Sequence, residues 1–259
     1  MKNLVKAQIE AGDHPLGTFY HTGSQTTAEV LGHAGLDYYV IDTEHGPFSA
    51  ESAADFIRAG KFAGSTPFVR VKDSSRSAIL KALDAGAMGI IVPDVRSLDE
   101  AKRIVQYGKY FPVGERGIAM TSGTGYWQQD WARSGLDNYM AISNAETMLI
   151  PQCETIGCLE AIEEIVALDG IDGIFVGPFD LSAALGKPGD LINPEHVAAV
   201  DRVLKACQAV GKASFIYSST IADAEARYQQ GFDSVAFSVD SMLLMEAVRS
   251  VVKRLGSGS

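Results

Sequence analysis

Short apolar runs, rich in β-branched and aromatic residues, recur along the chain, and each is about the length of a β-strand. Eight such runs occur, at residues 16–20, 38–41, 67–71, 89–92, 147–150, 173–176, 213–217 and 234–237. Between most of them the apolar residues recur every three or four positions, which is the period of an amphipathic helix. The predicted helices span residues 26–34, 50–62, 75–83, 98–110, 158–167, 194–210, 221–230 and 242–255.

Alternating strands and helices in this number predict an α/β fold, the (β/α)8 TIM barrel. A doubly wound open sheet is the alternative, because alternation alone does not prove that the sheet closes. No Gly-x-Gly-x-x-Gly motif follows the first run, so a dinucleotide-binding sheet has little support. We expect a single barrel domain over residues 1–255, followed by a flexible tail at residues 256–259.

One segment interrupts the alternation, between the fourth and fifth apolar runs. Residues 111–144 are rich in glycine, serine, aromatic and polar residues, and we expect a long loop insertion there. Long loops within compact domains often form lids or binding segments. The segment is therefore expected to fold over the barrel mouth, to pack on another subunit, or to form an ordered surface excursion.

Composition narrows the possible partners. The 259 residues carry a formal net charge of −10, and clustered Lys and Arg are absent, which argues against a nucleic-acid surface and favours a small metabolite. The three cysteines form no CxxC motif, so neither a disulfide framework nor a zinc site is expected. No long apolar run indicates a signal peptide or a membrane span. We expect a cytoplasmic protein with reduced thiols.

Two acidic residues follow neighbouring apolar runs in the segment 147–189. Glu154 lies just beyond the fifth run and Asp180 just beyond the sixth, with a helical segment between them. Adjacent parallel strands end about 5 Å apart, so these carboxylates can converge on one point. Carboxylate oxygens are the ligands that hard divalent cations prefer. The pair predicts a metal site, although a strand-end aspartate also serves as a helix cap.

Further ionisable residues lie at other strand ends. Asp42 and His45 follow the second run, and a carboxylate there can orient the imidazole as a general base. Arg70 ends the third run and shares a strand face with Phe68. A buried arginine needs an anion, so Arg70 is a candidate for binding a substrate carboxylate or an enolate oxygen, or for an internal salt bridge.

The strand-end residues lie in sequence blocks that resemble the HpcH/HpaI family of class II pyruvate aldolases. The matching blocks are DTEHG at 42–46, VRVKD at 69–73, LDAGAMGIIVPDV at 83–95, PQCET at 151–155 and DGIFVGPFDLSAALGKPG at 172–189. The blocks are several and occur in the family's order, and the similarity spans about residues 14 to 240. The resemblance implies a barrel that assembles as a homohexamer and binds Mg²⁺, Mn²⁺ or Co²⁺ through Glu154 and Asp180.

The resemblance also implies roles for single residues. His45 would be the catalytic base beside Asp42, and Arg70 would stabilise the enolate. An aspartate matching Asp84 is credited with raising the histidine's basicity, and here it could reach a site only across a subunit interface. Pyruvate would be bound by Gln152, Gly177, Pro178, Phe179 and Asp180. The family archetype has smaller residues where Thr43 and Phe179 stand, so the aldehyde preference of this chain is expected to differ.

The expected reaction is reversible cleavage of a 4-hydroxy-2-oxo acid to pyruvate and an aldehyde, through a metal-bound pyruvate enolate. Oxaloacetate decarboxylation at the same site is an alternative. A Schiff-base aldolase would need a desolvated lysine, for which Lys72 is the candidate. Another alternative is a barrel that binds an oxyanion without catalysing a reaction. The candidate base argues against it, because a protein that only binds has little use for a base. The sequence does not identify the aldehyde, although Arg116 and Arg133 could bind a distal carboxylate.

Overall fold

Eight parallel strands close into a barrel in the computed structural model, which describes residues 2–256. The hydrogen-bonded order runs from β1 to β8 and returns to β1. The predicted TIM barrel is therefore confirmed, and the alternative of an open sheet is wrong. Most of the flexible tail predicted at 256–259 lies outside the described residues. The strands are β1 Leu16–Tyr20, β2 Tyr38–Asp42, β3 Thr66–Arg70, β4 Gly89–Val92, β5 Met148–Cys153, β6 Gly173–Val176, β7 Ala213–Ser218 and β8 Ser234–Val239.

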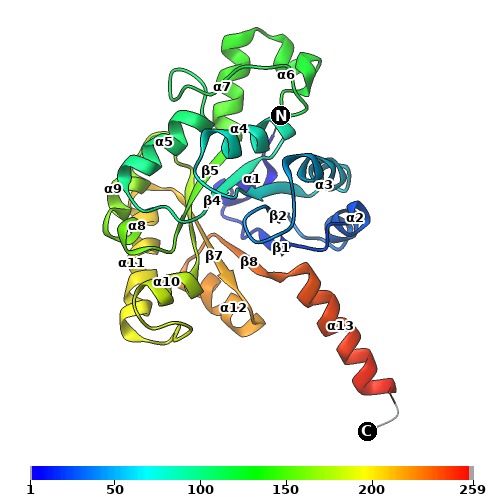
Figure 1. Ribbon diagram of the computed structural model, residues 1–259, viewed down its shortest axis with the longest axis vertical. Coiled ribbons are helices and arrows are strands. Elements are labelled where there is room, and N and C mark those ends of the chain that lie inside the picture. The colour runs from blue at the N-terminus through cyan, green and yellow to red at the C-terminus, as the bar shows by residue number, and fades with distance from the viewer. Residues whose placement is uncertain (1, 257–259) are drawn as a thin grey trace.

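Helices surround the barrel (Figure 1). All eight predicted helical segments are found, but the segment expected at 158–167 is broken at Ala161 into two short helices. The helices α1, α6, α7, α10 and the 3₁₀ turn η1 were not predicted. The bounds are α1 Leu4–Glu10, α2 Gln25–His33, α3 Ala50–Phe62, α4 Arg76–Ala85, α5 Leu98–Gly108, η1 Gly125–Trp127, α6 Asp130–Arg133, α7 Leu136–Glu146, α8 Ile156–Glu160, α9 Ile162–Val166, α10 Pro178–Ala184, α11 Pro194–Val210, α12 Ile221–Gln230 and α13 Asp240–Leu255.

The apolar core has two main layers, because side chains alternate between the two faces of each strand. One layer fills the barrel and includes the buried rings of Tyr38, Phe68 and Phe215. The other lies between the strands and the outer helices and includes Cys153, so the Cys153 side chain points away from the barrel interior. The side chains of Gln152 and Glu154, on either side of it, are therefore directed to the inner face.

Helix α1 closes the amino-terminal end of the barrel. Its Val5 is fully buried and belongs to the layer inside the barrel. The side chain of Asn3 caps the helix by accepting from the Lys6 backbone N–H, and it donates to the carbonyl oxygens of Met88 and Glu146. These contacts tie α1 to the starts of β4 and β5. The barrel is therefore open to ligands at its carboxyl end.

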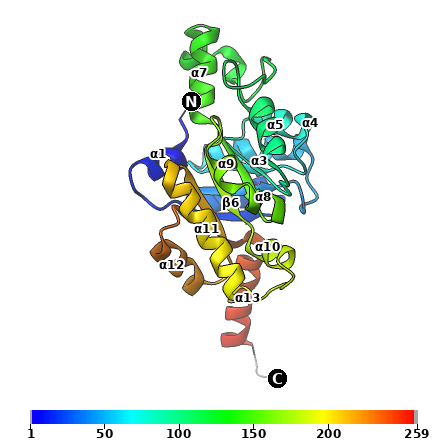
Figure 2. The same cartoon turned by 90° about the vertical axis from the view of Figure 1, so that its left-hand side faces the viewer.

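The segment at 111–144 contains more regular structure than the predicted loop insertion. It holds η1, α6 and most of α7, whose Tyr139 packs with Tyr110 and Trp131 in a small separate core. Gly123 N–H donates to the carbonyl of Asp84 at the end of α4, so this part lies near the amino-terminal end of the barrel. The segment does not cover the mouth of its own barrel. Figure 2 shows α7 and α13 projecting at opposite ends of the molecule.

Helix α13 is attached to the barrel by its first turn. Asp240 is buried and accepts hydrogen bonds from the backbone N–H groups of His21 and Thr22. Beyond this turn the helix projects away from the barrel (Figure 1). Seven apolar side chains along it are exposed, namely Met242, Leu244, Met245, Val248, Val251, Val252 and Leu255. Among residues 2–256, no helix is long and apolar enough to cross a membrane.

The packing inside the barrel predicts that Gly17 cannot be enlarged without cost. A Cβ atom at Gly17 would lie 2.3 Å from ring atoms of Tyr38, which is fully buried and hydrogen-bonded to Ser234 at 2.9 Å. Because the ring cannot move without breaking this contact, Gly17→Ala should lower the free energy of unfolding by about 1 to 3 kcal/mol. Urea denaturation followed by circular dichroism measures the change.

Gly117→Ala is the matched control, since a Cβ there meets only the flexible end of Arg76, at 3.2 Å. Both substitutions reduce the entropy of the unfolded chain equally, so their difference isolates the steric cost. Equal stability of the two variants would contradict the packing described for the barrel interior.

Candidate active site

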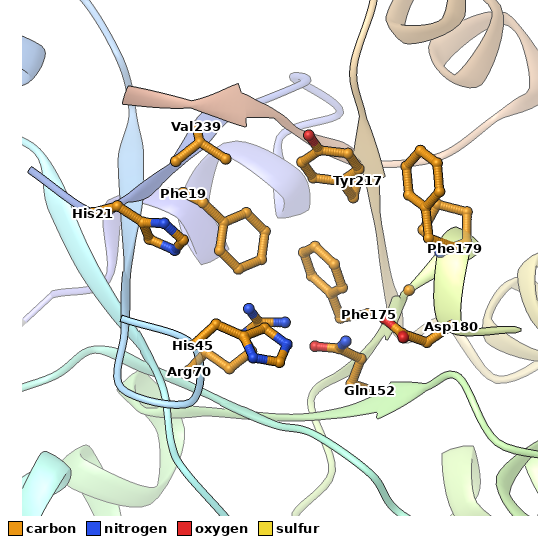
Figure 3. A pocket seen from close by; sticks show the side chains of 12 residues that line it. Phe19, His21, His45, Arg70, Gln152, Phe175, Phe179, Asp180, Tyr217 and Val239 are labelled. Atoms are coloured by element: carbon orange, nitrogen blue, oxygen red, sulfur yellow. The ribbon is translucent and has the colours of Figure 1, made fainter. Parts of the chain in front are cut away.

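A pocket of about 190 Å³ opens at the carboxyl ends of the barrel strands. Figure 3 shows the rings of Phe19, Tyr217 and Phe179 along one side, facing Arg70 and Gln152 on the other. The pocket therefore offers charged and amide groups to one part of a ligand and aromatic surface to another. Its lining residues are Phe19, His21, His45, Arg70, Gln152, Phe175, Gly177, Pro178, Phe179, Asp180, Tyr217 and Val239.

A buried ion pair lies in the wall of this pocket. Asp42 and Arg70 are register partners on β2 and β3, so their side chains leave the sheet on the same face. Arg70 donates through Nε to Asp42 Oδ1 at 2.9 Å and through a terminal nitrogen to Oδ2 at 2.7 Å. Its Nε also lies 3.2 Å from the Glu44 carboxylate. The anion that Arg70 requires is therefore supplied within the chain, by two carboxylates.

The surroundings of Asp42 favour its charged form. Burial opposes ionisation, but hydrogen bonds from His21 and Arg70 outweigh it and hold the pKa of Asp42 well below its usual range. For Arg70, burial lowers the pKa, but the hydrogen bond and charge of Asp42 outweigh this and raise it. Both groups therefore stay charged at neutral pH, and the pair is permanent.

The Asp42 carboxylate contacts a different histidine from the one expected. Its Oδ2 lies 2.7 Å from Nε2 of His21, whereas His45 reaches Oδ1 only through its backbone N–H at 3.3 Å. The imidazole of His45 lies 3.9 Å from the Glu44 carboxylate and is 65% exposed. The expectation that Asp42 orients the His45 ring is therefore wrong for this chain. His21 had no role in the sequence analysis, although its place directly after the first strand was a usable signal.

The two carboxylates expected to bind metal lie on neighbouring elements. Glu154 follows β5 directly, whereas Asp180 lies in the first turn of α10 rather than at a strand end. Both also line an adjoining polar crevice together with Glu44, His45 and Asp94. Within residues 2–256, no cluster of three or more His, Cys, Asp or Glu side chains is arranged to hold a metal ion. Any cation here would need oxygen atoms from other groups as well.

Nearby groups fit such a cation. The side-chain oxygen of Gln152 is buried without a hydrogen-bond partner among the described residues, while its nitrogen donates to Glu154. A Cβ atom at Gly177 would lie 2.7 Å from the Glu154 carboxylate and 2.9 Å from the Gln152 amide. Because Gly177 has no side chain, an open space remains beside the Gln152 side-chain oxygen, which accepts no hydrogen bond from the described residues. Two carboxylates and one free amide oxygen form a donor set suited to Mg²⁺ or Mn²⁺, and the space at Gly177 leaves room for the ion.

The pKa of Glu154 is shifted in the opposite direction from that of Asp42. Burial raises its pKa to about 7, and the negative charges of Asp180 and Glu44 act in the same direction. Hydrogen bonds from the Asp94 backbone and from Gln152 oppose the rise. The three carboxylates thus form a local concentration of negative charge.

Helix α10 places the remaining predicted pocket residues. Gly177 precedes the helix and Pro178 is its first residue, where the missing N–H of proline costs no hydrogen bond. Phe179 is 46% exposed, and its ring packs against Tyr217 with centroids 6.1 Å apart. The predicted set of Gln152, Gly177, Pro178, Phe179 and Asp180 therefore shares one pocket with His45 and Arg70.

Several other candidates lie elsewhere. Asp84 accepts a hydrogen bond from Arg116 at 3.0 Å and does not line the pocket. Arg116 lies over the ring of Tyr110, and Arg133 donates to Gln128, so within this chain neither arginine supplies the pocket with a distal carboxylate site. Lys72 is 67% exposed, which does not provide the desolvated amine of a Schiff-base enzyme.

Comparison with known proteins relates this geometry to a family. The family described as HpcH/HpaI aldolase/citrate lyase matches residues 16–247. The hydroxypyruvate/pyruvate aldolase of Roseobacter denitrificans is 33% identical over 258 residues, covering 99% of this chain and 98% of that protein. The 2-keto-3-deoxy-L-rhamnonate aldolase of Klebsiella pneumoniae is 33% identical over 249 residues, covering 96% and 91%.

Solved structures give the same relationship. A crystal structure of an HpcH/HpaI aldolase/citrate lyase family protein from Burkholderia cenocepacia has a TM-score of 0.90 at 32% identity, covering 99% of this chain and all of that one. The citrate synthase SbnG has a TM-score of 0.85 at 28% identity, covering 96% of both chains. The barrel thus has a fold that is shared by several related proteins.

The buried pair predicts a large and pH-dependent loss of stability in Asp42→Asn. The substitution leaves the Arg70 charge without its main partner, so the free energy of unfolding at neutral pH should fall by about 3 to 5 kcal/mol. Because the pKa of Asp42 is depressed by folding, its contribution is complete above the unfolded value of about 3.9 and shrinks as pH falls below it. Urea denaturation of both proteins at neutral pH and at about pH 3 tests this.

The control is Asp99→Asn, whose carboxylate is exposed and lies 3.4 Å from Lys102. Exposed pairs contribute about 0 to 1 kcal/mol, so this variant should resemble the parent at both pH values. A difference between Asp42→Asn and the parent that did not shrink in acid would contradict the ionised state assigned to Asp42.

Proposed function

Because the chain belongs to the HpcH/HpaI aldolase/citrate lyase family and is a carbon–carbon lyase, we propose that it reversibly cleaves a 4-hydroxy-2-oxo acid to pyruvate and an aldehyde. Family membership was expected from the sequence motifs and is confirmed. The proposal depends mainly on one observation, which is that Arg70, Gln152, Asp180 and His45 line a single pocket. These groups suit the stabilisation of an enolate and the transfer of a proton.

The 2-oxo acid part of the substrate binds at the polar side of the pocket. Its carboxylate accepts hydrogen bonds from the backbone N–H of Phe179 and from the Gln152 amide, beside Gly177 and Pro178. Arg70 stabilises the negative charge that develops on the 2-oxygen, and such a donor contributes about 3 kcal/mol in other enzymes. Arg70 is positioned for this role because Asp42 holds it by two hydrogen bonds.

A divalent cation is the expected cofactor. Glu154 and Asp180 would hold it, with Mg²⁺, Mn²⁺ or Co²⁺ as the candidates. When bound, the cation supplies Lewis-acid polarisation of the 2-oxo group. His45 lies where the pocket meets the acidic crevice, and its exposed imidazole acts as a proton-transfer group at the reacting end of the 2-oxo acid.

The experiment is a metal-dependent cleavage assay. Purified protein is treated with a chelator and then supplied with Mg²⁺, Mn²⁺ or Co²⁺ and a panel of 4-hydroxy-2-oxo acids, and pyruvate release is measured enzymatically. The acids in the panel are those whose cleavage would release lactaldehyde, succinic semialdehyde or tartronate semialdehyde. Oxaloacetate is added as a decarboxylation substrate. The proposal predicts pyruvate from at least one aldol, only when the metal is present.

Variants of the two carboxylates test their assignment. Outer-shell partners of metal sites are worth about 10- to 100-fold, so removing a direct ligand by Glu154→Gln or Asp180→Asn should lower turnover by at least about 100-fold. Glu163→Gln, on the exposed surface of α9, is the control and should keep parental activity. Full turnover of either ligand variant without added metal would refute the metal assignment.

The chain assembles as a homo-oligomer, and the family resemblance suggests a hexamer. The support for this assembly is α13, whose seven exposed apolar residues lie on a helix that only its first turn attaches to the barrel. We propose that a second copy of the chain covers this apolar surface. In such an assembly Asp84, which does not line its own pocket, acts on the site of a neighbouring subunit.

Charges on α13 should therefore dissociate the oligomer. Leu244 and Val248 lie one helical turn apart on one face and are 61% and 52% exposed. Replacing both with Glu puts two charges into an apolar interface, so light scattering after gel filtration should show a smaller mass than the parent assembly. Ser250→Glu on the same helix is the control. A monomeric parent protein, or an unchanged mass of the double variant, would contradict the proposal.

A further inference from the structure

A second imidazole, from His21, faces the pocket. His21 follows β1 directly, and its backbone N–H donates to the buried carboxylate of Asp240 at 2.8 Å. Its side chain is 31% exposed and lines the same pocket as His45. The backbone is thus anchored on one side of the residue while the ring remains open to a ligand.

The hydrogen bond to Asp42 fixes which nitrogen of His21 carries the proton. The depressed pKa of Asp42 means that this carboxylate is ionised at neutral pH and can only accept. The Nε2 atom of His21, at 2.7 Å, is therefore the donor. In the neutral ring the lone pair then lies on Nδ1, so Nδ1 is the atom that can take a proton from a ligand.

The contrast with His45 points to His21 as the better supported base. A carboxylate that accepts from one nitrogen of an imidazole orients the ring and stabilises the imidazolium that forms. His21 has such a partner at 2.7 Å, whereas the ring of His45 has, within residues 2–256, only the Glu44 carboxylate at 3.9 Å. Asp42 is itself held by Arg70, so the carboxylate, the imidazole and the guanidinium form one connected group.

The position of His21 relates it to the aldehyde part of the substrate. Figure 3 shows Gln152 and Asp180 at one end of the pocket and His21 with Val239 at another. If the 2-oxo acid part lies at Gln152, as proposed above, the chain of the substrate runs past Arg70 toward the rings and His21. The 4-hydroxyl group then belongs near the His21 imidazole rather than near the acidic crevice.

We propose that His21 is a catalytic residue that exchanges the proton of the substrate 4-hydroxyl group, an assignment that rests on the proposed aldolase function. In cleavage, the 4-hydroxyl proton moves to Nδ1 of His21, the oxygen forms a carbonyl, and the C3–C4 bond breaks. Its electron pair forms the enolate of pyruvate, whose C3 then takes a proton from His45 or water. The imidazolium of His21, stabilised by Asp42, returns its proton to solvent, so the reaction is balanced without an added reactant.

The variant His21→Gln tests this role, because it should impair proton transfer at the 4-hydroxyl group and leave proton transfer at C3 unchanged. The glutamine amide nitrogen reaches the place of Nε2 and donates to Asp42, but it cannot accept a proton. Its kcat/KM for the panel substrate that the parent cleaves fastest should fall by about 100-fold or more. Exchange of the pyruvate methyl protons with deuterium, followed by NMR with Mg²⁺, needs no 4-hydroxyl group and should stay within about threefold of the parent.

His33→Asn on the exposed surface of α2 is the matched control and should match the parent in both assays. Thermal melting checks the fold, and His21→Asn replaces His21→Gln if the latter is unfolded. Cleavage by the folded variant within about threefold of the parent, or equal losses of cleavage and exchange, would overturn the role of His21. A parent protein that neither cleaves the panel nor exchanges pyruvate protons would overturn the aldolase function itself.

Discussion

The buried pair of Asp42 and Arg70 is the interaction on which the site depends. It joins the ends of β2 and β3, and through His21 it includes the end of β1 as well. The guanidinium also lies 4.7 Å above the ring of Phe19, which gives it a contact on its apolar face. Since a buried charge without a partner costs several kcal/mol, each member fixes the position of the others. The polar side of the pocket is therefore rigid before a ligand arrives.

The barrel supplies this rigidity because its amino-terminal end is closed and apolar, whereas its carboxyl end carries the polar groups. Helix α1 inserts Val5 at the amino-terminal end, and the interior is filled with large rings such as Tyr38 and Phe215. Polar groups that would be costly in that interior gather instead at the carboxyl end, where water and ligands can reach them. The charged groups at the carboxyl end therefore rest on a close-packed core.

The barrel could be predicted from the sequence because every strand is a short apolar run, and most of the segments between the runs have the apolar period of a helix. The sequence also predicted most pocket residues, since Arg70, Gln152 and Asp180 lie at or just beyond the strand ends. It did not predict the partner of Asp42. His21 and His45 both follow strands, and only the register between β1 and β2 decides that the carboxylate meets His21. The helices α7 and α10 were missed because they are short or lie in segments with strong loop composition.

The contacts of three arginines bear on which aldehyde the proposed reaction would release. The two loop arginines that were candidates for a distal carboxylate are engaged elsewhere, with Arg116 on Asp84 and Arg133 on Gln128. Arg70 is held by Asp42 and Glu44. The pocket surface beyond Arg70 is formed by aromatic rings, among which Phe179 and Tyr217 are packed edge to face. For the proposed reaction, such a surface favours a neutral aldehyde over an acidic one, because a carboxylate placed there would lose its hydration without gaining an arginine partner.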